Sequence, residues 1–150
     1  MARTAIALIC LICLAGASHA RSLDNDAEVE SLLADCAPLT GYNQSWCRAE
    51  QARFIQLFQR ALGRDYHSQR SVASCLAGGC DGAVKVNPVA ACAWRLLILE
   101  SGYTFVNSID TDNQKADCES LSTLQAQEAV RSLAGSLMQR IYGKPLLTVR

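Results

Sequence analysis

Cysteine is the residue type with the widest range of chemistry in this chain, and the sequence contains eight among 150 residues. Thiolates bind zinc, carry out redox exchange or close structural disulfides, and spacing separates these roles. Two cysteines lie in an apolar N-terminal segment. The other six are an even number without a Cys-x-x-Cys pair, and the chain beyond residue 20 has one histidine, His67. This pattern favours disulfides over a zinc site or a redox motif.

Six cysteines allow 15 pairings, and spacing alone does not select one of them. We favour the pairing of sequence neighbours, which gives Cys36–Cys47, Cys75–Cys80 and Cys92–Cys118. The first would tie a turn between two helices, and the second would close a loop whose two glycines permit a tight bend. The third would hold a long loop against the preceding helix. Each disulfide would contribute about 2–3.5 kcal/mol to stability before strain.

The first 20 residues have the pattern of a secretory signal peptide. Arg3 gives a basic start, residues 5–15 are apolar, and Ser18 and Ala20 place small residues at the two positions that a signal peptidase reads. The apolar run is too short to span a bilayer. We therefore expect cleavage after Ala20, a single helical domain over residues 21–150, and a periplasmic or secreted location without an integral membrane segment.

Charge and motif content exclude several functions. Removing Arg3 from the 14 basic residues leaves 13 against 14 acidic ones, a balance that argues against nucleic acid as a partner. Neither a Gly-x-Ser-x-Gly elbow nor a phosphate-binding glycine loop occurs. Acids crowd residues 102–119, but a calcium loop starting at Asp110 would place Lys115 where glycine is needed and Leu121 where glutamate is needed. We expect a solvated loop there, no metal and no cofactor.

Hydrophobic periodicity is helical almost throughout, and only the terminal stretch Leu146 to Val149 resembles a strand. Ser45 is expected to cap the second helix, and Ser122 with Gln125 forms a capping box for the last one. The predicted helices cover residues 26–36, 45–62, 68–76, 88–101 and 122–142.

The fourth of these helices carries a pattern of its own. Asn87 is a good N-cap, Ala91 and Trp94 share one face, and Gly102 suits a left-handed stop. Together with Val84, this spacing resembles the Sel-one-like repeats, a subfamily of the tetratricopeptide-type helix-pair repeats. Asn87 replaces the usual Asp, and bulky residues replace a pair of alanines.

The first helix of such a repeat carries Leu-Gly-x-x-Tyr, which Leu62-Gly63-Arg64-Asp65-Tyr66 matches. Val84 then follows about twelve residues later than the family spacing, so Ser68 to Gly79 is interpreted as an insertion. The resemblance covers about Leu62 to Gly102. Together with the helical periodicity and the six cysteines, it predicts an all-α, disulfide-stapled fold with flanking helices, in which a helix over about 120–142 caps the repeat.

The resemblance also implies a non-catalytic role in binding another protein, because helix-pair repeats present a groove of side chains. An alternative is a secreted carrier of a small apolar ligand, and a small secreted enzyme is a weaker one. Alanine-rich helix faces favour close packing over a hollow centre, so we expect no closed cavity.

The signal sequence and the even cysteine count predict a mature protein that begins at or near Arg21 and has no free thiol. Intact mass measured with and without reductant and alkylating agent tests both parts. Six thiols alkylated in non-reduced exported protein would contradict the disulfides.

Overall fold

The computed structural model describes residues 25–147. The expected signal peptide and half of the strand-like terminal stretch lie outside this range; the other half, Leu146 and Leu147, is not in a strand. The chain divides into two units, one up to Leu32 and one from Leu33 onward. In the first unit, residues 25–31 form a helix. The predicted extension of this helix to residue 36 is wrong, because the Ala34 amide donates to the carbonyl of Ala83 instead of to its own helix.

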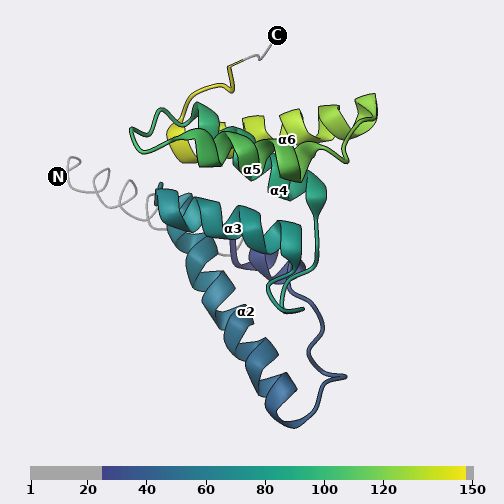
Figure 1. Ribbon diagram of the computed structural model, residues 1–150. Helices are drawn as coiled ribbons and strands as arrows, with labels where there is room; N and C mark the ends of the chain where they lie inside the picture. The colour runs from purple at the N-terminus through teal and green to yellow at the C-terminus, as the bar shows by residue number, and fades with distance from the viewer. Residues whose placement is uncertain (1–24, 148–150) are drawn as a thin grey trace, which may run out of the picture. The chain divides into compact units, whose positions relative to one another are not determined.

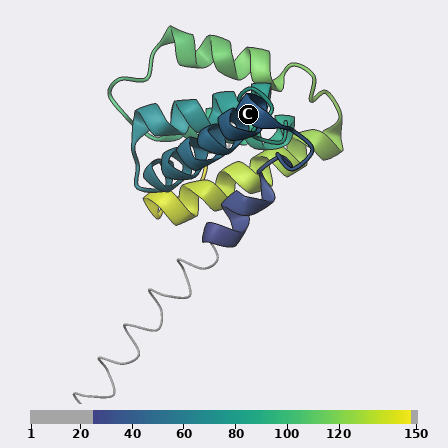
Figure 2. The same cartoon turned by 90° about the horizontal axis from the view of Figure 1, so that it is seen from below.

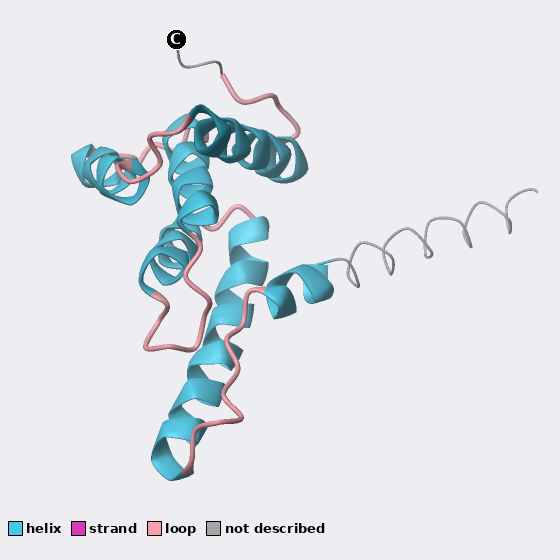
Figure 3. Cartoon of the chain, turned by 90° about the vertical axis from the view of Figure 1, so that its right-hand side faces the viewer, coloured by secondary structure: helices cyan, strands magenta, loops and turns pink. Residues whose placement is uncertain are grey.

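The second unit is built from five helices and, within residues 33–147, has only an isolated bridge between Leu33 and Val84 in place of a strand (Figures 1 and 3). This confirms the all-α class. The helices are α2 (Gly41–Leu62), α3 (Tyr66–Gly78), α4 (Pro88–Glu100), α5 (Ser108–Cys118) and α6 (Leu124–Tyr142).

Helix α4 lies at the centre of this unit. It packs against α3, α5 and α6, while α2 packs against α3. Figure 2 shows α5 and α6 on different sides of α4. Eight of the 13 residues of α4 are buried, so this helix is covered nearly all round instead of along one stripe. The ring of Trp94 meets that of Phe58 edge to face, with centroids 5.9 Å apart, and this contact brings α2 to the same core.

The ends of α4 are the ones that the sequence predicted. The side chain of Asn87 accepts a hydrogen bond from the Ala90 amide at 3.0 Å, and Pro88 occupies the first helical position. Gly102 has a φ of +78°, a left-handed conformation that residues with a Cβ rarely adopt. The capping chemistry alone therefore located this helix to within a residue.

Three other predicted starts are wrong by two to four residues. Helix α2 begins at Gly41 instead of at residue 45, without a side-chain cap. Helix α6 is capped by Thr123, not Ser122, because the threonine hydroxyl accepts from the Ala126 amide. Helix α3 starts at Tyr66, because the Asp65 carboxylate accepts from the Ser68 amide at 2.7 Å. In α6 and α3 the hydroxyl or carboxylate that reaches an unpaired amide sets the boundary.

The segment interpreted as an insertion, Ser68 to Gly79, makes up most of α3 and packs against α4, so the helix predicted over residues 68–76 is present and extends further at both ends. One predicted loop also forms a helix. The segment expected to be a solvated loop contains α5, which begins with a capping box: Asn107 accepts from a first-turn amide, and Asp110 accepts from the Asn107 amide at 3.1 Å. An Asn-x-x-Asp sequence can make the same reciprocal bonds as the usual Ser-x-x-Glu.

All three disulfides of the favoured pairing are present, with Cα atoms 4.8 to 6.0 Å apart: Cys36–Cys47, Cys75–Cys80 and Cys92–Cys118. The first closes the turn before α2, the second closes the end of α3, and the third joins α4 to the end of α5. The third spans a separation of 26 residues and is the only one of these that joins two of the labelled helices.

The two tryptophans provide a matched test of this core. Trp94 is 2% exposed and Trp46 is 44% exposed. Trp94→Ala should lower the free energy of unfolding by about 3–5 kcal/mol, whereas Trp46→Ala should change it by less than about 1 kcal/mol. Urea unfolding followed by circular dichroism measures both. Equal effects of the two substitutions would contradict the central place of Trp94.

Candidate functional site

The residues singled out by the repeat pattern are two core side chains of α4 and the two residues that flank this helix, of which Asn87 is half-buried and Gly102 is exposed. Ala91 and Trp94 are buried within α4, Asn87 caps its start, and Gly102 ends it. These positions therefore build the scaffold. A ligand or partner has to be met by other side chains.

An apolar hollow of about 520 Å³ lies between α4, α5, α6 and the segment after α6, and it is partly open to solvent. The Cys92–Cys118 disulfide lies at its edge. Val130, which lines the hollow, also belongs to a small buried cluster with Ala93 and Ala134. The apolar lining of the hollow comes mainly from Leu96, Leu99, Leu121, Val130, Leu146 and Leu147.

One carboxylate lies in this apolar lining. Glu100, the last residue of α4, accepts a hydrogen bond from the Leu147 amide through Oε2, which holds the C-terminal segment beside the hollow. Its other oxygen, Oε1, is buried and has no hydrogen-bond partner among residues 25–147. A buried polar atom left in this state costs about 1–3 kcal/mol. Glu100 is therefore the residue of the hollow that is best placed to select a ligand.

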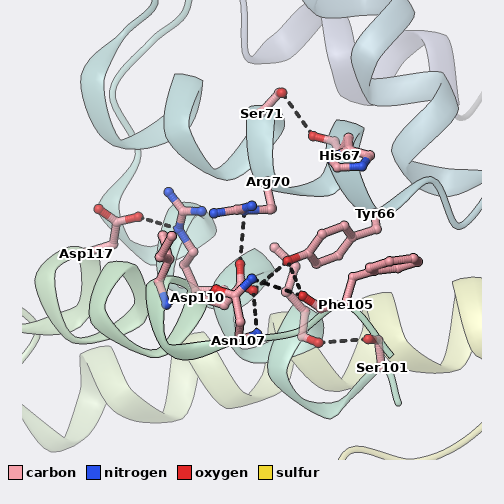
Figure 4. Close-up of polar contacts among 12 residues, drawn as sticks. Tyr66, His67, Arg70, Ser71, Ser101, Phe105, Asn107, Asp110 and Asp117 are labelled. Atoms are coloured by element: carbon pink, nitrogen blue, oxygen red, sulfur yellow. Dashed lines mark hydrogen bonds and ion pairs between the residues drawn. The ribbon is translucent and has the colours of Figure 1, made fainter. Parts of the chain in front are cut away.

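A second cluster joins α3 to the start of α5 (Figure 4). The Tyr66 hydroxyl lies 2.6 Å from Oδ2 of Asp110, which is 1% exposed, and 3.1 Å from the Phe105 carbonyl oxygen. Nε of Arg70 lies 3.0 Å from Asp110 Oδ1. That approach is an ion pair without hydrogen-bond alignment, since Oδ1 has no hydrogen-bond partner in the described part of the chain.

This environment raises the pKa of Tyr66 above its usual value of 10.0. The main cause is burial, which disfavours the phenolate, and the hydrogen bond to the Asp110 carboxylate adds to it; the nearby Arg70 guanidinium opposes both. The tyrosine thus stays a proton donor, and the cluster works as a fixed link between α3 and α5.

Beside this cluster lies a polar hollow of about 350 Å³, lined by residues that include His67, Ser71, Arg70 and Arg95. Each arginine has a carboxylate partner: Arg95 Nε lies 2.7 Å from Asp117 Oδ2. The Ser71 hydroxyl donates to the backbone carbonyl of His67 and not to its ring. Ser71 and His67 therefore lack the serine–imidazole hydrogen bond of a nucleophilic site. The two arginines, through their ion pairs, join α3 and α4 to α5.

Neither a metal site nor a membrane-spanning helix is found among residues 25–147. No group of three or more histidine, cysteine or acidic side chains is placed to hold a metal ion. None of the helices in that range is long and apolar enough to span a membrane.

No protein-family model, curated protein or solved structure matches this chain. The resemblance to the Sel-one-like repeats therefore stays a prediction.

The sequence did not point to Glu100, Tyr66 or Asp110 as site residues. Glu100 had one available signal, an acid at the end of a mostly apolar helix, which places a negative charge at the unfavourable end of the helix dipole. Tyr66 and Asp110 are 44 residues apart, and no local pattern joins them.

The raised pKa of Tyr66 predicts a pH dependence of stability. The unfolded chain releases the tyrosine proton near pH 10, whereas the folded chain keeps it to higher pH. The contribution is therefore fully present below pH 10 and is lost as pH rises through the folded pKa. The free energy of unfolding, measured with urea, should fall more steeply above pH 10 for the wild type than for Tyr66→Phe. Tyr42→Phe, an exposed control, should follow the wild type. If the free energy of unfolding of the wild type and of Tyr66→Phe fell with pH at the same rate, the raised pKa of Tyr66 would be contradicted.

Proposed function

We propose that the protein is an exported, non-catalytic module that binds another protein. The observation that carries this proposal is a pair of exposed aromatic rings one turn apart on α2. Tyr42 is 76% exposed and Trp46 is 44% exposed, and their rings stack with centroids 6.1 Å apart. Tyrosine and tryptophan are enriched at protein interfaces and often supply much of the binding energy.

The start of α2 is well suited to present these rings. The buried residues of α2 begin at Cys47, so the preceding turn has no face in the core. The Cys36–Cys47 disulfide fixes the helix just after the aromatic pair. One turn further on, the Gln51 amide donates to the backbone carbonyl of Ala34 at 2.6 Å. Aromatic side chains held on a rigid helix lose little conformational entropy on binding, which favours affinity.

Two further features support the proposal. Helices α3 and α4 are consecutive and pack against each other, which is the arrangement of a helix-pair repeat, although the Leu62–Tyr66 motif spans the end of α2 and the start of α3 instead of lying within one helix. Three disulfides persist only in an oxidising compartment, which supports export. We expect the partner to be a protein of that same compartment.

The double substitution Tyr42→Ser with Trp46→Ser tests the proposal, because it removes the rings and leaves the core untouched. Affinity capture from the native compartment, compared quantitatively with the wild type, should show at least about a tenfold loss of the recovered partner, since interface aromatics often contribute 2 kcal/mol or more. The matched control is Leu124→Ser, which is 79% exposed at the start of α6. Unchanged recovery with the double variant would place the interface elsewhere.

A further inference from the structure

The apolar hollow between α4, α5 and α6 points to a second activity that does not depend on the aromatic pair of α2. We propose that it binds a small molecule with an apolar body and a hydrogen-bond donor at one end, an ammonium or a hydroxyl group, and that the donor bonds to Glu100 Oε1.

The dimensions of the hollow suit such a molecule. Ligand pockets typically enclose about 300–1,000 Å³ and combine an apolar lining with a few well-placed polar groups. This hollow, at about 520 Å³, lies within that range, and its lining is mostly leucine and valine. Helices α5 and α6 both pack on α4. The hollow is the space between side chains of these three helices and of the segment after α6.

Glu100 determines which end group fits. Its Oε2 is already occupied by the Leu147 amide, which fixes the carboxylate in place. Oε1 is buried beside apolar side chains without a partner in residues 25–147. Only a donor satisfies this atom, and a hydrogen bond to a charged group contributes more than a neutral one. A ligand with a carboxylate end would instead meet the negative charge of Glu100.

Among the described residues that line the hollow, Arg131 is the one cation, and it is an exposed residue of α6. A pairing of an anionic ligand with this side chain would be screened by water and would contribute little. The buried carboxylate oxygen therefore outweighs the exposed guanidinium, and the hollow should prefer amines and alcohols to fatty acids.

Three eight-carbon probes, octylamine, octanol and octanoate, separate these end groups while keeping the apolar body constant. Each is titrated into the disulfide-intact protein below its solubility limit and, for the two charged probes, below the micellar concentration, and binding is followed by methyl NMR. We expect one-to-one binding with shifts at Leu96, Leu121 and Leu146, and octylamine and octanol bound at least about tenfold more tightly than octanoate. Equal affinities, tighter binding of octanoate, or no binding would overturn the proposal.

Glu100→Gln tests the role of the carboxylate with almost no change of shape. Its amide oxygen can still accept from the Leu147 amide, which directs the NH₂ group into the hollow in place of Oε1. The preference should then reverse, so that octanoate binds more tightly than octylamine. Glu50→Gln on α2 is the matched control, since Glu50 does not line the hollow, and it should keep the wild-type order. If Glu100→Gln bound the three probes in the wild-type order of affinity, Glu100 would be excluded as the selecting group.

The double serine variant of Tyr42 and Trp46 should bind all three probes as the wild type does, which separates this site from the proposed protein interface.

Discussion

The burial of α4 is the constraint on which the rest of residues 33–147 depends. A helix that is apolar on nearly every face is stable in water only when other elements cover it, and α4 is covered by α3, α5 and α6 together. The ring of Trp94 brings α2 to the same core through Phe58. Because one helix is shared by all these contacts, a cavity in α4 weakens several interfaces at once.

The covering helices are held to α4 in different ways. Helices α3 and α6 bury apolar side chains, such as Leu76 and Met138. Helix α5 buries a single residue, Asp110, and has no apolar stripe. It is held by four specific links instead: the Tyr66–Asp110 hydrogen bond and the Arg70–Asp110 ion pair at one end, the Arg95–Asp117 ion pair, and the Cys92–Cys118 disulfide at the other end. The buried Asp110 carboxylate is tolerated because its Oδ2 accepts two hydrogen bonds and its Oδ1 is paired with the Arg70 guanidinium.

This difference explains which parts of the fold the sequence could predict. Apolar periodicity and capping chemistry locate α4, α6 and most of α2, because these helices bury a hydrophobic face. Helix α5 has a capping box but no apolar periodicity, since its buried group is an acid whose partner lies 44 residues away. The start of α2 was missed for a related reason, because Tyr42 and Trp46 belong to a turn that faces away from the core. The disulfides followed from sequence neighbours, and Glu100 is recognised only once the Leu147 amide is seen beside it.

The mode of attachment of α5 has a consequence for motion. Segments that bury little apolar surface open locally at a free energy well below that of global unfolding. Detachment of α5 from its charged contacts would leave α2, α3, α4 and α6 packed, while the disulfide at Cys118 would keep the free helix tethered to α4. Helix α5 would then move as a hinged segment, or flap, that stays attached to α4 through the disulfide at its C-terminal end. Amide hydrogens of α5 would then exchange with solvent faster than those of α4, and Gln114, which lines the hollow from α5, would swing away with the flap.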